Sequence, residues 1–218
     1  MRARALGYGV VLILVVASIA LQMTVTGSDF TRFVTIALQA ATLIAAVRAS
    51  GVRRRGARLA SLAAAVGVLT ALLTWAIKGD IPESSTAIVN GLLVAVAPVA
   101  IARGLLSDLR EDHTVTVSTL AGVLAIYLLA GMFFSFLYGV IGAVDADALF
   151  AQQASADPSN QLYFSFVTLC TVGYGDLTPA ADLPRTLAVV EMLVGQIYLV
   201  TVVALIVSNL GTRRQRAS

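Results

Sequence analysis

The hydrophobic pattern of the chain consists of long apolar runs separated by short polar segments. Six runs are long enough to cross a bilayer as helices, which takes about 20 residues each. The fourth run is short and contains Asn90 and Pro98. A further apolar piece, residues 160–170, would span only about half a bilayer as a helix, which indicates a re-entrant segment. The predicted spans are Leu6–Val25, Phe30–Val47, Leu59–Ile77, Ala87–Ala102, Val115–Ile141 and Pro184–Leu210.

Composition supports the same conclusion. Hydrophobic residues make up 58% of the 218-residue chain and charged residues only 12%, whereas a soluble domain carries about 25% charged residues. The net charge of +3 does not require a nucleic-acid partner, because the basic residues lie between apolar runs, where they set topology. One cysteine, Cys170, and one histidine, His113, allow no intrachain disulfide and no Cys/His metal cluster. We expect an all-α membrane protein without nucleic acid or an organic cofactor.

The distribution of basic residues predicts the orientation of the spans. With the N-terminus inside, 12 of the 15 Lys and Arg residues fall on the cytoplasmic side, as the positive-inside rule requires. This places both termini in the cytoplasm and the loop after residue 170 on the outer face of a multi-pass protein of the cell membrane. The inner residues are Arg2, Arg4, Arg48, Arg53, Arg54, Arg55, Arg58, Arg103, Arg110, Arg213, Arg214 and Arg216; the outer ones are Arg32, Lys78 and Arg185.

The first span has an alternative interpretation as a cleaved signal peptide. Residues 1–20 combine a basic start, an apolar core and small residues near Ala20, which are the features of such a peptide. Cleavage would leave every later loop on the same side, so the charge distribution does not decide between the two. The apolar run continues to Val25, longer than an ordinary signal core, and this favours a retained helix.

A polar stretch, Ser107–Thr114, divides the chain into two predicted domains. Residues 1–112 would form a four-helix transmembrane domain whose end, residues 103–112, is a short amphipathic helix at the inner surface. Residues 113–218 would form a hairpin of two spans, 115–141 and 184–210, with the re-entrant helix between them.

The segment between the re-entrant helix and the last span has unusual backbone chemistry. Non-helical backbone at membrane depth is tolerated only where it is buried in protein or faces water or ions. In residues 171–175, TVGYG, the two glycines can adopt left-handed backbone without a Cβ clash. The carbonyl oxygens would then face one side and, with the Thr171 hydroxyl, form a ladder of cation sites. The C-terminal dipole of the preceding helix also favours a cation, and Ser159 or Asn160 is its predicted N-cap.

TVGYG is also the selectivity-filter sequence of potassium channels. From about Val115 to Leu210 the chain resembles the pore module of the tetrameric potassium channel superfamily. It shows an outer helix, a pore helix (YFSFVTLC), a filter (TVGYGD) and an inner helix, preceded by four spans as in six-span members. The resemblance implies six transmembrane helices plus a re-entrant pore helix and filter loop, assembled as a four-fold symmetric homotetramer.

The resemblance further implies passive conduction of K⁺ without enzymatic chemistry. The ion would be held by backbone carbonyls of the filter, while other residues shape its surroundings. Alternatives are a pore-derived regulatory or structural subunit, a less selective cation channel, which Tyr174 disfavours, and a plain glycine-rich turn, which would need no half-length helix. The implied site residues are Thr171, Val172, Gly173, Tyr174 and Gly175 for K⁺, Asp176 at the outer mouth and Thr168 on the pore helix.

The last span contains two further candidates. Glu191 is an ionisable group within the membrane, which is costly unless it is paired and faces protein. We expect it to support the filter from behind, near Ser165, Thr168 or Tyr174; a purely structural carboxyl is the alternative. Gly195 is either a hinge for an inner gate or a small residue for close helix packing. Residues predicted to line the inner cavity or pack behind the filter are Gln196, Val200 and Cys170.

The fourth span has no basic residue between Ala87 and Ala102. Because voltage sensing needs several charges within the span, we expect this domain to occupy the position of a voltage sensor without gating arginines. The cluster Arg53, Arg54, Arg55 and Arg58 has two interpretations, a site for anionic lipid headgroups or a topology determinant.

Overall fold

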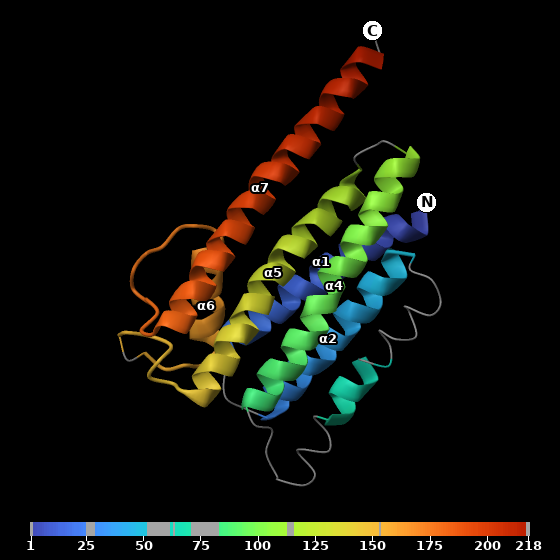
Figure 1. Ribbon diagram of the computed structural model, residues 1–218. Helices are drawn as coiled ribbons and strands as arrows, with labels where there is room; N and C mark the ends of the chain where they lie inside the picture. Colours follow the sequence, from blue (N-terminus) through green and yellow to red (C-terminus); the bar gives the residue numbers. More distant parts are fainter. Residues whose placement is uncertain are drawn as a thin grey trace.

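The computed structural model describes residues 2–24, 29–51, 62, 64–70, 83–112, 116–152 and 154–216. Their regular structure is helical, and their only strand-like feature is an isolated antiparallel bridge between Phe150 and Pro179. The labelled helices in Figure 1 are α1 (Arg2–Thr24), α2 (Asp29–Ala49), α4 (Glu83–Asp112), α5 (Val117–Val144), α6 (Pro158–Leu169) and α7 (Asp182–Arg216).

Within the described residues, five helices are long and apolar enough to cross a membrane: α1, α2, α4, α5 and α7. They lie where the first, second, fourth, fifth and sixth spans were predicted. The predicted third span, 59–77, falls largely outside the described residues, of which 64–70 are helical. With 12 residues, α6 extends over only about 18 Å, which is too short to cross a bilayer. The fold is that of a helical membrane protein.

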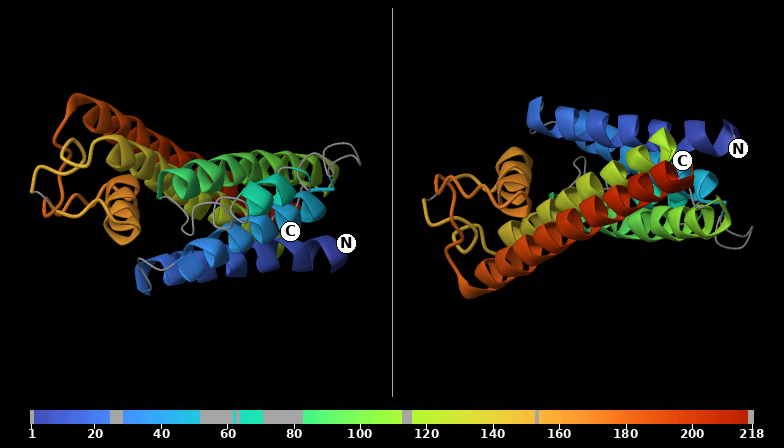
Figure 2. Two further views of the ribbon diagram at one scale, coloured as in Figure 1. Left: turned by 90° about the horizontal axis from the view of Figure 1, so that it is seen from below. Right: turned by 90° about the horizontal axis from the view of Figure 1, so that it is seen from above.

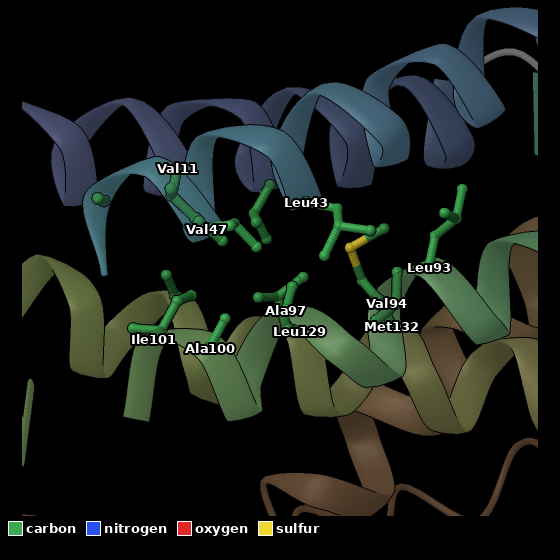
Figure 3. Packing of buried hydrophobic residues seen from close by; sticks show 14 of the residues in the cluster. Val11, Leu43, Val47, Leu93, Val94, Ala97, Ala100, Ile101, Leu129 and Met132 are labelled. Atoms are coloured by element: carbon green, nitrogen blue, oxygen red, sulfur yellow. The ribbon is translucent and has the colours of Figure 1, made fainter. Parts of the chain in front are cut away.

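Helices α1, α2 and α4 pack with α5 around an apolar core. Figure 3 shows Val11 and Leu43 on one side of this core facing Val94, Leu129 and Met132 on the other, and all five side chains are buried. Helices α4 and α5 run antiparallel and side by side (Figures 1 and 2), separated along the chain by residues 113–116 alone. Helices α1 and α4 therefore pack directly on α5 of the same chain.

Helix α4 is longer than predicted. It continues without a break from Glu83 to Asp112, so residues 103–112 are its last turns rather than a separate helix at the inner surface. The apolar face explains the continuity, because Ala97, Ile101 and Leu105 follow one another at helical spacing and are all buried. Pro98 lies inside the helix, where it removes one backbone hydrogen bond without ending the helix.

Helix α6 lies beside one end of α5 and α7, and α7 extends well beyond the other helices (Figure 1). Glycine permits the contact between α6 and α5: a Cβ on Gly131 would lie 2.8–3.2 Å from the ring of Phe166. The opposite face of α7 has no neighbour among the described residues. Its large apolar side chains, including Leu193, Ile197 and Val200, are exposed.

Candidate functional site

Helix α6, the predicted pore helix, begins at Pro158 and is capped by Asp157. The Asp157 carboxylate accepts a hydrogen bond from the Asn160 amide at 2.8 Å. The prediction that Ser159 or Asn160 is the N-cap was therefore wrong. The signal for the correct cap was present in the sequence, because an acidic residue directly before a proline at the first helical position is a common helix start.

At its other end, α6 passes directly into the filter segment. The amides of Thr171 and Val172 donate to the carbonyls of Thr168 (2.9 Å) and Val167 (2.9 Å), and Cys170 donates to Phe166 (3.0 Å). Thr168, singled out from the sequence, thus contributes its carbonyl to this turn, while its side chain is buried. The first filter residues are held by the last turn of the helix.

The backbone of residues 171–175 alternates in handedness. Positive φ angles occur at Thr171 (55°), Gly173 (56°) and Gly175 (80°), while Val172 and Tyr174 lack them. The glycines were expected to take this conformation, but Thr171 was not. For a residue with a Cβ, the left-handed conformation costs about 1–2 kcal/mol. The hydrogen bonds of the Cys170 and Val172 amides help to stabilise it at Thr171. Such alternation directs successive carbonyls to one side of the segment.

A hydrogen bond ties Asp176, directly after the predicted filter, to the middle of α6. The Tyr163 hydroxyl donates to Asp176 Oδ2 at 2.6 Å, and the Leu177 amide donates to Asp176 Oδ1 at 3.0 Å. The bond from Tyr163 is the main reason that the pKa of Asp176 lies below its ordinary value. The same bond raises the pKa of Tyr163 to about 12. Sequence reasoning placed Asp176 at this mouth and missed Tyr163.

The loop between α5 and α6 is hydrogen-bonded to the segment that follows the predicted filter. Ala151 donates its amide to the Thr178 carbonyl at 2.8 Å. The Gln152 side chain accepts from the Thr178 amide (2.9 Å) and donates to its hydroxyl (2.8 Å). The Phe150 ring packs edge-on against Phe164 of α6. The polar sequence of this loop did not reveal the pairing.

Glu191 lies behind the pore helix and is completely buried. One carboxyl oxygen lies 2.5 Å from Ser165 Oγ in α6, and the other accepts a hydrogen bond from the Tyr138 hydroxyl in α5 at 2.8 Å. Of the three expected neighbours, the structure bonds the carboxyl to Ser165 and not to Thr168 or Tyr174. Tyr138 was missed, because nothing in a one-chain pattern relates positions 53 residues apart.

Gly195 faces the end of the pore helix. A Cβ there would lie 3.1 Å from both the carbonyl carbon and Cδ1 of Leu169, and closer still to the Leu169 oxygen. This close approach agrees with the interpretation of Gly195 as a small residue for close helix packing. Helix α7 is continuous through Gly195. Nearby, the Tyr127 hydroxyl donates to the Leu169 carbonyl (3.3 Å) and to Cys170 Sγ (3.4 Å).

Comparison with known proteins gives a match to the part of the chain that contains α6 and the predicted filter. Residues 122–211 match the model of a protein family described as "Ion channel". The match supports an ion channel. It covers most of α5 and α7, all of α6 and every predicted filter residue. No curated protein and no solved structure gives a significant match to the chain.

Several side chains in the matched region are exposed in the described structure. Val172 and Tyr174 of the filter are exposed, as are Gln196 and Val200 of α7. Cys170 is exposed too, so within one chain it is not packed behind the filter as expected. The arginine cluster at positions 53–58 lies outside the described residues.

Proposed function

We propose that the protein is a potassium-selective channel that conducts K⁺ passively through residues 171–175. The observation that carries this proposal is the alternation of positive φ at Thr171, Gly173 and Gly175. A row of carbonyl oxygens directed to one side can replace the hydration shell of a cation. The ion sites would be formed by the carbonyls of Thr171 to Gly175 and the Thr171 hydroxyl, with K⁺ as the permeant ion.

We also propose a homotetramer with four-fold symmetry. One chain supplies a single row of carbonyls, whereas a filter needs a ring of them. The exposed apolar face of α7 and the exposed side chains of Val172 and Tyr174 supply the surface that such an assembly would cover. Identical chains that meet through different patches close into a ring. Asp176 would then border the outer mouth, and Gln196 and Val200 would line an inner cavity.

The lack of gating charges supports a channel that is not opened by voltage. No Lys or Arg occurs in α4 from Glu83 to Ala102, and Arg103 lies past the buried centre of the helix. Moving one charge through 100 mV is worth about 2.3 kcal/mol, so a span without a basic residue from 87 to 102 cannot couple strongly to the membrane potential. We also propose that the protein lies in the cell membrane with both termini in the cytoplasm. Anionic lipid headgroups would bind at Arg53, Arg54, Arg55 and Arg58.

Purified protein in liposomes tests the proposal. A K⁺ gradient should drive flux, and a Na⁺ gradient should drive little. Gly173→Ala should abolish K⁺ flux, because its Cβ disfavours the left-handed backbone at φ 56°. Gly9→Ala in α1 is a matched control, since its Cβ would meet nothing within 4 Å, and it should leave flux unchanged.

Two results would contradict the proposal. Equal Na⁺ and K⁺ flux would favour a less selective cation channel. A well-folded tetramer without any flux would favour a regulatory or structural subunit that conducts only with a partner. Steep voltage dependence of opening in planar bilayers would contradict the proposal on gating alone.

A further inference from the structure

The hydrogen bonds around Glu191 determine where its proton lies. Three buried side chains meet there: Tyr138 from α5, Ser165 from α6 and Glu191 from α7, each 0% exposed. Ser165 Oγ has two short contacts, one of 2.5 Å to Glu191 Oε1 and one of 2.6 Å to the Gly131 carbonyl of α5. Each contact is short enough to require a proton between its two oxygens.

Counting protons around Ser165 favours one arrangement. A carbonyl oxygen only accepts, so the contact with Gly131 must use the single hydroxyl proton of Ser165. The contact between Ser165 and Glu191 then needs a second proton, which only the carboxyl can supply. Tyr138 donates to the other carboxyl oxygen at 2.8 Å. If Glu191 were ionised, one of the two Ser165 contacts would join bare oxygens and would have to open.

The surroundings of Glu191 agree with a neutral acid. From α5 it faces Tyr138 and, further away, Tyr127, whose hydroxyl bonds to Leu169 and Cys170 instead. From α6 it faces Ser165. Among the described residues Glu191 has no cationic partner; Arg185 of α7 lies six residues earlier, about 9 Å along the helix, with its side chain exposed beside Asp182. A buried carboxylate without a compensating charge is strongly unfavourable.

We propose that Glu191 is a neutral carboxylic acid that joins α7, α6 and α5 and thereby positions the filter. The acid donates to Ser165, Ser165 donates to Gly131, and Tyr138 donates back to the acid. Because α6 also supplies the carbonyls of Val167 and Thr168 that hold the filter amides, a shift of α6 would move the filter. This role rests on the proposed function, whereas the protonation state does not.

Infrared spectroscopy of the full-length protein tests the protonation state without any flux. The difference spectrum of wild type minus Glu191→Gln at neutral pH should contain the C=O band of a protonated carboxylic acid in wild type. A shift of that band in Tyr138→Phe would confirm that it belongs to this carboxyl. If this difference spectrum contained wild-type carboxylate bands and no band of a protonated acid, the proposal would be overturned.

Liposome flux tests the positioning role. Glu191→Gln keeps one donor and one acceptor, so its K⁺ to Na⁺ selectivity should match wild type. Glu191→Met has similar volume and neither group, and its selectivity should fall about tenfold, the cost of roughly one hydrogen bond. If Glu191→Gln lost as much K⁺ to Na⁺ selectivity as Glu191→Met, with both variants folded, the proposal would be overturned. If wild type itself carried no flux, the proposed function would fail and the infrared result would still decide the protonation.

Discussion

The two halves of the molecule treat their buried polar groups differently. Behind α6, the Glu191 carboxyl is bonded to both Ser165 and Tyr138. In α1, α2 and α4, Gln39 Nε2 donates to Ser18 Oγ at 2.8 Å, but both side-chain amide atoms of Asn90 and the Oε1 atom of Gln39 are buried without a hydrogen-bond partner in the described structure. The core around them is apolar, as Figure 3 shows.

This contrast separates two ways of holding helices together. Most contacts among α1, α2 and α4 are apolar, and apolar packing is not directional. A closed hydrogen-bond network requires defined positions for each helix, and leaving one member unpaired costs about 1–3 kcal/mol. The surroundings of residues 171–175 have contacts of the second kind.

The largest stability effect should come from the contact between α7 and α6. Gly195→Ala would place a Cβ against the Leu169 carbonyl, and such overpacking costs about 1–3 kcal/mol. Gly91→Ala in α4 is the matched control, because its Cβ would lie 3.5 Å from Phe136 Cβ, an ordinary contact. Thermal unfolding in detergent should show a lower Tm for Gly195→Ala only. Equal Tm values would show that the α6–α7 contact can relax.

A paired substitution tests the contrast between the halves directly. Asn90→Leu removes two unpaired polar atoms from an apolar core, so it should leave the free energy of unfolding unchanged or raise it by up to about 2 kcal/mol. Ser165→Ala removes a bonded group and leaves Glu191 without this partner. The change should lower the free energy of unfolding by about 1–3 kcal/mol. Both changes are measured by chemical or thermal unfolding. Destabilisation by Asn90→Leu would mean that the Asn90 amide has a role in the four-helix domain.

The smallest effect should be a shift in pH dependence at the outer mouth. The bond from Tyr163 holds the pKa of Asp176 below its ordinary value of 3.8. Its contribution is therefore present above that value and is lost as the pH falls through the lowered pKa. In Tyr163→Phe, acid inhibition of K⁺ flux should begin at a higher external pH than in wild type. Asp176→Asn should remove this component, and an unchanged profile in Tyr163→Phe would contradict the role of the bond.

The success of sequence reasoning here follows the range of the interactions involved. The apolar runs predicted the five described spans, because their length and composition are local properties. The cap at Asp157 is equally local, but the choice among neighbouring polar residues depended on a backbone angle. The end of α4 was missed because the polar stretch at 107–112 obscured the apolar face that continues through Leu105.

By itself, the sequence determined the membrane helices, the half-length pore helix and the glycines at 173 and 175, since each depends on a few adjacent residues. The tertiary structure alone determined the partners that meet across helices. Tyr163 reaches Asp176, Gln152 pairs with Thr178, and Tyr138 bonds to Glu191, whereas Ser165 was one of three neighbours expected for Glu191 from the sequence. Such contacts depend on how the helices pack in three dimensions, which brings together residues that are far apart along the chain.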